Sequence, residues 1–487
     1  MKRILAFLML AAVVGLLWRS GDPVVLGPPS QATPGVDLEG DGSVWFCPAG
    51  ATEGFAHQGV ATNLGSTPMT ARLSGFAETA TSIPAVALID LAPHQRVVVD
   101  TAEALPGMSS VMVELSGGAG IVEHRLVSER SSDVGRCTTI ASGVFYFPAV
   151  DTSRDVAGGA ASVPPVARLW LLNPFPTDAS VDVLVAQEDG VRVPPSLRGL
   201  VIPGGSVRSI DLGQDALQRR SQGSVTVLAR AGQIVAELSQ SGDGVGGGEG
   251  LRLQLGIPRA EQQWLFADGF AGAGVTERYV VLNPGNDAVT VELAVSVAGD
   301  QAFQPEPFVR DIPARRFTVF DLHQESRLPE SGLRWVTITT ESGTGVAVAR
   351  VVALTQAGDG ATDRPAVANG LAGSTGSTEA ASAWAFGSAG LEDGSQVVSI
   401  ANPDPEAIAV VKLTRWVDGV ESAVGDPVEV APGASFAVDV TAGVAVPNAG
   451  VVLTVSSSTP VVAEFRSSTD SRVDLSVTAG APLRSRS

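Results

Sequence analysis

The chain has 487 residues, and this length suggests roughly three or four domains of 100–200 residues each. Lys and Arg total 32 against 51 for Asp and Glu, which gives a net charge of -19. This acidic balance argues against nucleic-acid binding, which needs a basic surface. With 44% hydrophobic and 17% charged residues, the composition also excludes a disordered acidic chain and indicates a folded, turn-rich protein.

The N-terminus has the pattern of an export signal, since Lys2 and Arg3 precede an apolar run from Ile4 to Trp18. As a helix this run would be roughly 22 Å long, shorter than the ~30 Å hydrocarbon core of a bilayer. The bulky Trp18 and the following Arg19 offer no clean cleavage site. A cleaved signal and a signal anchor therefore both remain open for residues 1–19, and we expect the body of the chain at the extracytoplasmic face of the membrane or in the cell envelope.

Residues 20–43 are rich in Pro, Gly and acidic residues and have no hydrophobic period, so we expect an extended linker. Asp37, Glu39, Asp41 and Gly42 match the first half of a calcium-binding loop. The twelfth position of that loop is Pro48 and lacks the carboxylate that calcium requires. A solvated acidic linker is the better interpretation, and we predict no metal site.

Only two cysteines occur, Cys47 and Cys137, 90 residues apart. In an oxidising compartment such a pair predicts one disulfide, which in the chain-entropy model would stabilise the fold by about 4.6 kcal/mol less any strain. Four histidines are present, none with metal-ligand spacing, and we expect them to be surface or turn residues: His57, His94, His124 and His323.

A short phrase containing asparagine recurs four times, at Asn63, Asn173, Asn283 and Asn402. The last three of these asparagines are followed by proline, as expected where a strand ends in a turn. Other features keep the same order: an aromatic opening strand, a strand led by proline and a closing pair of strands. The Pro-led strands end near Asp100, Asp211, Asp321 and Asp439. The chain therefore contains four repeats.

The opening strand of the first repeat contains Cys47, and the matching positions of the other three are Phe147, Phe266 and Phe386. We expect the later units to bury an aromatic ring where the first unit has its disulfide. Cys137 follows the closing strands of the first repeat, so the predicted bridge joins the two ends of that unit.

Each repeat has about seven short alternating strands, and helical periodicity is almost absent after the signal segment. The predicted fold is all-β: a tandem array of four immunoglobulin-like β-sandwich units after an N-terminal hydrophobic helix. A β-propeller-like arrangement of the repeats is the alternative, although propeller blades are usually about half this length. The expected units are 44–140, 141–240, 263–356 and 383–487. Residues 241–262 form a linker with a possible strand at 251–255, and residues 357–382 form a Gly/Ser-rich linker.

No arrangement of residues indicates catalysis, and we predict no catalytic, cofactor-binding or metal-binding residue. A Gly-x-Ser-x-Gly elbow between a strand and a helix is absent from the sequence. The four aspartates that end the Pro-led strands are typical of strand exits. Asp404 and Glu406 lie two residues apart, which is typical of a turn. On strand-like runs, Trp170, Trp335 and Trp416 are expected in the core.

The opening Trp45-Phe46-Cys47-Pro48-Ala49-Gly50, Cys137 ahead of Phe145-Tyr146-Phe147, and the recurring Leu-Asn-Pro strands resemble an uncharacterised family of exported actinobacterial proteins. That family is catalogued as domain of unknown function 5719, and the resemblance runs from about Val44 to the C-terminus. It implies an exported protein and carries no assigned activity, cofactor or catalytic residue.

Two functions fit these observations. The first is a non-catalytic exported scaffold that contacts cell-envelope proteins and meets the membrane only through its N-terminal segment, its loops and domain edges supplying the contacts. The second is a glycan-binding or glycan-processing protein that uses Asp404 and Glu406 as paired carboxylates.

Overall fold

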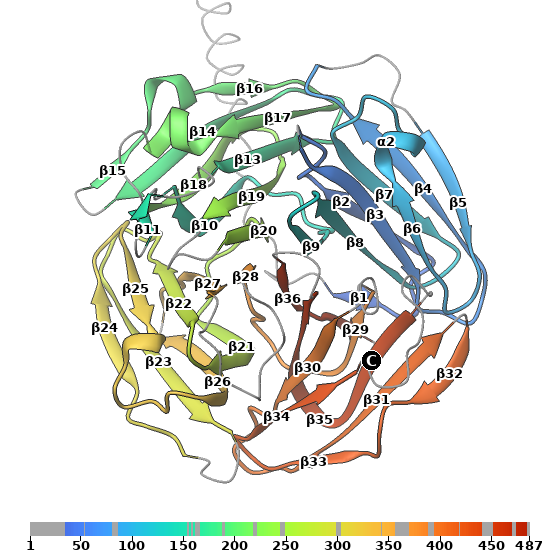
Figure 1. Ribbon diagram of the computed structural model, residues 1–487. Coiled ribbons are helices and arrows are strands. Elements are labelled where there is room, and N and C mark those ends of the chain that lie inside the picture. Colours follow the sequence, from blue (N-terminus) through green and yellow to red (C-terminus); the bar gives the residue numbers. More distant parts are fainter. Residues whose placement is uncertain are drawn as a thin grey trace, which may run out of the picture.

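Four consecutive segments of the chain fold into similar pairs of β-sheets, which stand around a central axis (Figure 1). This computed structural model describes residues 35–487 apart from 53, 80–85, 153–154, 157–158, 161–165, 188–189, 218–221, 244–248, 299–302, 342, 356–369, 388–393, 418, 441–450, 470–473 and 485–487. The predicted signal segment and the first part of the predicted linker lie outside the described residues.

The elements repeat in the same order from unit to unit. Unit 1 contains β2 (Gly42–Cys47), β3 (Ala56–Asn63), β4 (Met69–Phe76), β5 (Val86–Leu91), β6 (Arg96–Asp100), α2 (Thr101–Ala104), β7 (Ser110–Ser116), β8 (Gly120–Val127) and β9 (Ser132–Arg136). Unit 2 contains β10 (Val144–Asp151), β11 (Asp155–Val156), β12 (Gly159–Ala160), β13 (Val166–Asn173), β14 (Ala179–Gln187), β15 (Gly190–Arg192), η1 (Pro195–Leu197), β16 (Leu200–Ile202), β17 (Ser206–Asp211), η2 (Gly213–Leu217), β18 (Gln222–Ala231), β19 (Val235–Asp243) and β20 (Glu249–Leu255).

Units 3 and 4 follow the same plan. Unit 3 contains β21 (Gln263–Ala271), β22 (Val275–Leu282), β23 (Val289–Val297), β24 (Phe308–Ile312), β25 (Phe317–Asp321), η3 (Leu322–Gln324), β26 (Gly332–Thr340), β27 (Ala347–Leu354) and β28 (Gly370–Ser374). Unit 4 contains β29 (Ala381–Phe386), β30 (Ser395–Ala401), β31 (Ala409–Val417), β32 (Val420–Ala423), β33 (Val428–Val430), β34 (Ser435–Asp439), β35 (Val451–Ser468), β36 (Leu475–Ala479) and β37 (Ala481–Arg484).

Each unit has an opening sheet, which contains its first strand, and an axial sheet, which ends at the centre of the ring. The opening sheet of unit 1 has the order β2-β7-β4-β5, and its axial sheet has the order β6-β3-β8-β9. Units 2 and 3 repeat both orders, with β15 and β16 sharing the outer edge in unit 2. In unit 4 the long strand β35 passes through both sheets, pairing with β31 near its start and with β30 near its end.

The prediction of an all-β chain is confirmed, but the immunoglobulin-like order is corrected by the pairing. An immunoglobulin constant domain places its first strand beside the second and its seventh beside the sixth. Here the first strand, β2, pairs with the sixth, β7, while the seventh, β8, pairs with the second, β3. An eighth strand, β9, completes the axial sheet. The alternation of apolar and polar residues predicts which segments are strands but not which strands pair. The pairing of β2 with β7 and of β8 with β3 could therefore not be predicted from the sequence.

The units form a closed ring instead of a linear array. The last strands of the four axial sheets, β9, β20, β28 and β36, contact one another in that order around the centre, and β36 returns to β9 (Figure 1). The ring is joined at the chain ends, where β1 (Val36–Asp37) pairs in parallel with β37 of unit 4. This arrangement is closer to the propeller-like alternative.

Two stretches expected to be linkers supply strands at the centre of the ring. β20 lies within 241–262 and pairs with β19, which assigns it to unit 2. β28 lies within 357–382 and pairs with β27 of unit 3. The predicted linker at 20–43 likewise contributes β1 and the start of β2. Gly and Ser content alone did not distinguish these short central strands from loops.

A separate hydrophobic core fills the space between the two sheets of each unit. Further apolar clusters lie between neighbouring units, one of which packs Trp170 of unit 2 against Phe46 and Phe76 of unit 1. Because both faces of the axial sheets are covered, every residue of β27 is buried. The ring therefore buries apolar surface within units and between them.

The four repeated asparagines hold equivalent turns together. Each is fully buried, and its Nδ2 donates to main-chain carbonyls of two separate turns while its Oδ1 accepts a main-chain N–H two residues on. In unit 3, for example, Asn283 Nδ2 donates to Asp287 O at 2.8 Å and to Ile312 O at 3.0 Å, and Gly285 N donates to Asn283 Oδ1 at 2.9 Å. The recurrence of asparagine is thus explained by its paired donor and acceptor.

The predicted disulfide joins Cys47 and Cys137, whose Cα atoms are 4.7 Å apart. Main-chain pairing places Thr138 opposite Phe46 and Ser377 opposite Leu265, so Cys137 of unit 1 matches Gly376 of unit 3. The same comparison matches Cys137 with Gly256 and Gly480 in the remaining units. A phenylalanine ring covers each of these three glycines. The prediction that the later units bury an aromatic at this place agrees with the structure.

Candidate functional site

The polar side chains that the ring buries lie mainly at the boundaries between units. Sheet pairing shows that Glu123, Glu237 and Glu464 occupy one position of the axial sheet in units 1, 2 and 4, and that Ala349 takes this position in unit 3. Glu237 Oε2 accepts the main-chain N–H of Ala49 in unit 1 at 2.9 Å. Glu464 Oε2 likewise accepts the N–H of Asp268 in unit 3 at 2.8 Å. We call these contacts the glutamate clamps.

At the boundary of units 1 and 2 the clamp continues into a chain of four side chains. Glu237 Oε1 lies 2.9 Å from His124 Nε2, and His124 Nδ1 lies 3.1 Å from His57 Nε2. Thr101 Oγ1 completes the chain, 3.2 Å from His57 Nδ1. Burial and the neighbouring His124 lower the pKa of His57 well below its ordinary value. None of the four side chains is more than 1% exposed, so these hydrogen-bonded side chains connect two units and are not open to a substrate.

The hydrogen bonds around His57 also fix which of its ring nitrogens carries the proton. Thr101 Oγ1 donates its one proton to the main-chain carbonyl of His57 at 2.9 Å, so it accepts from His57 Nδ1–H, and His57 Nε2 accepts from His124 Nδ1–H. The arrangement depends on His57 remaining neutral, which agrees with its lowered pKa.

At the boundary of units 3 and 4 the clamp belongs to a larger set of paired charges. Arg350 occupies in unit 3 the position of His124 in unit 1, and its Nη1 lies 3.4 Å from Glu464 Oε2. Glu277 matches His57; it accepts the Tyr279 hydroxyl at 2.8 Å and forms an ion pair with Arg334. Burial raises the pKa of Glu464, and Arg350 opposes this shift. All of these charged side chains are buried, so their pairing offsets the cost of removing them from water.

The boundary between units 4 and 1 uses arginine. Arg96 of unit 1 donates to Gly387 O of unit 4 at 3.0 Å, and Arg136 donates to Gly480 O at 2.7 Å. Burial lowers the pKa of each arginine to about 10, and attraction to Glu123 opposes that shift. Three boundaries therefore carry buried charged contacts around one glutamate position.

On the axis, Asp133 joins three units. Its carboxylate accepts the main-chain N–H of Leu253 in unit 2 at 2.5 Å, the Ser476 hydroxyl of unit 4 at 2.5 Å and its neighbour Val134 N–H at 2.8 Å. Burial raises the pKa of Asp133 to about 8 despite these hydrogen bonds. The centre of the ring is thus filled by contacts between units.

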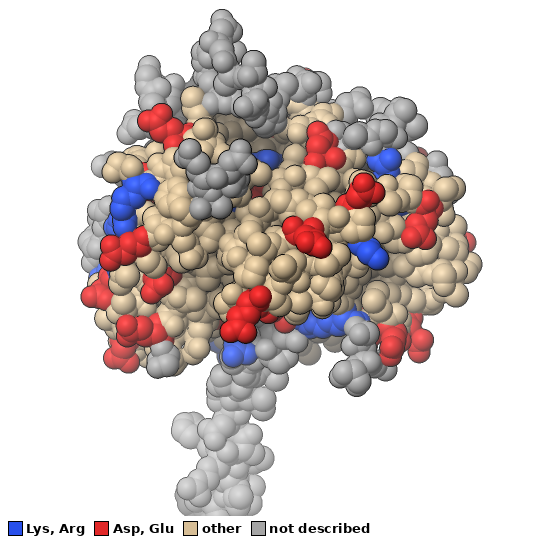
Figure 2. Space-filling view, turned by 90° about the horizontal axis from the view of Figure 1, so that it is seen from below, with Lys and Arg blue, Asp and Glu red and all other residues tan. Residues whose placement is uncertain are grey.

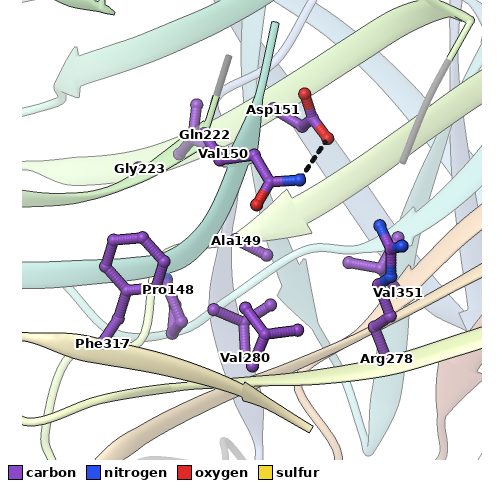
Figure 3. A pocket seen from close by; sticks show the side chains of 11 residues that line it. Pro148, Ala149, Val150, Asp151, Gln222, Gly223, Arg278, Val280, Phe317 and Val351 are labelled. Carbon is purple, nitrogen blue, oxygen red and sulfur yellow. Dashed lines mark hydrogen bonds between the residues drawn. The ribbon is translucent and has the colours of Figure 1, made fainter. Parts of the chain in front are cut away.

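Two of the pockets at the surface of the described residues involve unit 3. The first lies between units 2 and 3, where Val150, Val280, Val351 and Phe317 form apolar walls beside Arg278 (Figure 3). The second is more polar and lies in unit 3, between the β21–β22 turn and the loop that follows η3. His323, Glu325, Glu330 and Arg334 are among the residues that line it.

The structure corrects the expectation that all four histidines are surface or turn residues. His57 and His124 are 1% and 0% exposed, respectively, because the axial sheet of unit 1 is covered on both faces. His94 does lie in a turn and stacks on Trp416 of unit 4, with ring centroids 4.7 Å apart. His323 is exposed. Comparing the four repeats position by position would have found the recurring glutamates, but not the side chains that they contact in the neighbouring unit.

The repeated aspartates occupy strand exits, as expected. Asp100 accepts the N–H groups of Ala102 and Glu103 at the start of α2, and Asp211 accepts Gln214 N–H at 3.1 Å. Asp321 pairs with Arg278, and Asp439 ends β34.

The carboxylates of the glycan hypothesis lie in an exposed turn. Asp404 Oδ1 accepts the N–H groups of Glu406 and Ala407, each at 2.8 Å, and these hydrogen bonds lower the pKa of Asp404. Asp404 is thus used to shape its own turn.

The tryptophans on strand-like runs lie at boundaries between units. Trp170 and Trp335 are buried, and Trp335 Nε1 donates to Gly433 O of unit 4 at 2.8 Å.

Within the described part of the chain, no group of three or more His, Cys, Asp and Glu residues is placed to hold a metal ion. No helix among the described residues is both long and apolar enough to cross a bilayer.

Two solved structures share limited likeness with this chain. The Anabaena sensory rhodopsin transducer is 18% identical, with 19% of this chain and 88% of that chain covered and a TM-score of 0.17. Thermotoga maritima 1070 is 13% identical, with 24% of this chain and 91% of that chain covered and a TM-score of 0.17. Likeness at this level carries no argument about fold or function.

No curated protein matches the sequence. Residues 38–302, more than half of the chain, match the family described as "Family of unknown function (DUF5719)". This match includes both cysteines and all four side chains that are hydrogen-bonded at the boundary of units 1 and 2: His57, Thr101, His124 and Glu237. The chain therefore belongs to the DUF5719 family.

Proposed function

We propose that this protein is a non-catalytic exported scaffold that holds other cell-envelope proteins at the rim of its ring. The observation that supports this proposal is the use of the buried charged residues: the glutamate clamps and their arginine and histidine partners connect one unit to the next. Such contacts fix the relative positions of the units, as a scaffold requires. The disulfide between Cys47 and Cys137 supports an oxidising, exported location.

The outer edges of the opening sheets supply the proposed contact surface. In unit 1 this edge is β5, which contains neither proline nor lysine and exposes Val86 by 45% and Leu88 by 70%. In unit 2 the edge is split into β15 and β16, and in unit 4 it is split into β32 and β33. An uninterrupted edge strand that lacks proline and lysine favours addition of an extended segment by main-chain hydrogen bonds.

The partner proposed for β5 is an extended segment of an exported protein with apolar residues at alternating positions. Val86 and Leu88 alternate along β5, so apolar side chains on every second residue of an added strand would pack against them. Charge is a weaker guide, because on the face shown in Figure 2 acidic and basic side chains are interspersed among uncharged residues.

Crosslinking in native cells tests this proposal with two variants, made at positions whose wild-type side chains are equally exposed. Leu88→Lys places a charge on β5, whereas Val420→Lys places one on the interrupted edge at β32; both residues are 70% exposed. We expect the tagged wild-type chain and Val420→Lys to capture the same few envelope proteins and Leu88→Lys to lose them. Equal capture by both variants would contradict the role of β5, and retention by cell-wall polysaccharide without protein capture would support glycan binding instead.

A further inference from the structure

The boundary between units 2 and 3 lacks the glutamate clamp. Ala349 of unit 3 occupies the position that holds a glutamate in the other three units. On the facing unit, Leu238 occupies the position of His124 and Arg350, which are the basic partners of the clamps. Both members of the polar pair are therefore replaced by apolar residues at this boundary.

Hydrogen bonds across the boundaries follow the same pattern. Besides the clamps, Val207 N of unit 2 donates to Ala77 O of unit 1 at 3.1 Å, and Trp335 of unit 3 donates to Gly433 of unit 4. The boundary of units 4 and 1 has the arginine contacts described above. Between units 2 and 3, by contrast, no hydrogen bond or ion pair connects two residues that the structure describes.

The apolar side chains at this boundary are mostly small. The cluster there consists of Ala149, Val280, Ala349, Val351, Ala353 and Leu371, with Phe317 and Val319 partly buried against it. The small pocket of Figure 3 lies among several of the same residues. The cluster between units 1 and 2 contains three aromatic rings instead, which bury more apolar area each than alanine or valine. Units 2 and 3 are thus held together by apolar packing with few large side chains.

A buried arginine at this boundary has donors without partners. Arg252 of β20 is fully buried, and Gly373 of unit 3 lies so close that a β-carbon there would be 3.4 Å from Arg252 Nη1. Arg252 Nη2 donates to Ala149 O and to Gln240 Oε1, whereas Nε and Nη1 have no hydrogen-bond partner among the described residues. Burial lowers the pKa of Arg252 to about 10. Because unsatisfied buried donors are costly, hydration of this guanidinium favours separation of the two units.

A short connection keeps units 2 and 3 close when they separate. Ile257 pairs with Tyr146 of unit 2, and Glu261 pairs with Val346 of unit 3. Residues 258–260 therefore connect the two units, and such a segment can absorb a small change in backbone angles. A separation at this boundary is limited in extent and reversible.

We propose that the ring opens transiently at the boundary between units 2 and 3, ahead of the other three boundaries. Those boundaries stay closed because each would lose buried hydrogen bonds between units. Opening exposes Ala349 and Val351 to solvent. It leaves both units folded, because the described strand pairs lie within one unit or the other. This inference is independent of the scaffold function.

Labelling of single introduced cysteines in the purified full chain tests the proposal. Both native cysteines are held in the disulfide, so an introduced cysteine supplies the free thiol. Ala349→Cys places this thiol between units 2 and 3. Ala401→Cys is the matched control between units 3 and 4, where Ala401 packs with Trp335; both alanines are 0% exposed. Without urea, we expect iodoacetamide to label Ala349→Cys at least about tenfold faster than Ala401→Cys.

The dependence of labelling on urea distinguishes opening from unfolding. Opening of one boundary exposes less surface than unfolding of the chain, so the labelling rate of Ala349→Cys should rise less steeply with urea than the unfolding equilibrium does. Equal labelling rates of the two variants would overturn the proposal. Labelling of Ala349→Cys only in urea that unfolds the whole chain would also overturn it.

A second pair of variants tests whether the missing clamp causes the opening. Val351→Cys supplies a thiol at the same boundary, and Ala349→Glu is then added to it. The new carboxylate is expected to accept Ala149 N–H, as Glu464 accepts Asp268 N–H, and to pair with Arg252. Labelling should slow by about tenfold, the effect of one charge-assisted hydrogen bond. Unchanged labelling in a folded variant would contradict the role of the clamp, and if this variant does not fold, the comparison of Ala349→Cys with Ala401→Cys decides.

Discussion

Phe266 covers Gly376 so closely that a β-carbon on the glycine would lie 2.6 Å from the phenylalanine ring. Unit 1 has Cys47 at the position of Phe266 and Cys137 at the position of Gly376, and a disulfide joins them. The repeats therefore hold the opening strand against the segment after the last axial strand in two ways. Unit 1 uses a disulfide, and unit 3 uses a phenylalanine ring packed on a glycine.

This equivalence predicts the outcome of exchanging the two solutions. Replacing both cysteines by alanine should cost about 4–5 kcal/mol, the effect of opening a loop of this length. Cys47→Phe combined with Cys137→Gly should recover part of that loss, because the ring can cover the glycine as in unit 3. Urea unfolding compares the two double variants. Equal stability of the alanine pair and the Phe–Gly pair would contradict the equivalence.

The buried asparagines predict a large effect from a small change. Asn283→Ala leaves the carbonyls of Asp287 and Ile312 without their donor in a buried turn, which should cost about 2–3 kcal/mol. Asn286→Ala is the control, because Asn286 is exposed and its Oδ1 accepts hydrogen bonds from Arg315. Its effect should stay within about 0.5 kcal/mol. Urea unfolding curves that shift equally for both variants would argue against this role.

Local patterns in the sequence were enough to predict the strands, the four repeats and the disulfide. Asn63 and its equivalents could be recognised because each performs the same task within its own unit. The match of Cys47 with Phe266 followed from the repeat alone. These features depend on contacts that every unit makes for itself.

The closed ring and its boundary contacts could not be predicted in the same way. Glu237 and His124 are 113 residues apart and belong to different units, so no local period connects them. The residue that faces the glutamate also changes between boundaries. It is His124 for Glu237 and Arg350 for Glu464, and at the boundary of units 2 and 3 an apolar pair replaces both members. Burial of two histidines follows from coverage of the axial sheet by the next unit, which only the assembled ring provides.

Acidification should weaken the boundary between units 1 and 2. The pKa of His57 is lowered in the folded chain, whereas an unfolded histidine titrates near 6.5. Below about pH 6.5 the unfolded state therefore binds more protons, and stability falls by up to about 1.4 kcal/mol per pH unit until the pH passes the folded pKa. The full stability is therefore present above about pH 6.5, where His57 is uncharged in both the folded and the unfolded state.

Two histidine variants test this pH dependence. His57→Gln removes the buried titrating group, whereas His323→Gln changes an exposed histidine of unit 3. The slope of the free energy of unfolding against pH, measured between pH 5 and 7, should be less positive in His57→Gln than in the wild type, because the opposite contribution of Asp133 is common to both. His323→Gln should follow the wild type, and identical slopes for the two variants would assign the dependence to other groups.

The boundary between units 3 and 4 predicts strong coupling between two charged residues. Glu464→Ala leaves Arg350 buried without its nearest carboxylate and should cost about 3–5 kcal/mol. Adding Arg350→Leu imports the apolar pair that units 2 and 3 use, and the double variant should lose less stability than the sum of the single variants. A double-mutant cycle measures this coupling. Additive losses would show that the two side chains act independently.

Contacts across the boundaries are expected to make the four units one cooperative ring. Hydrogen–deuterium exchange in increasing urea tests it most directly, with peptides from β8, β19, β27 and β35 reporting one unit each. The closed ring predicts that all four peptides lose protection at the same urea concentration. Separate midpoints for the four units would contradict it and indicate a chain of independent domains.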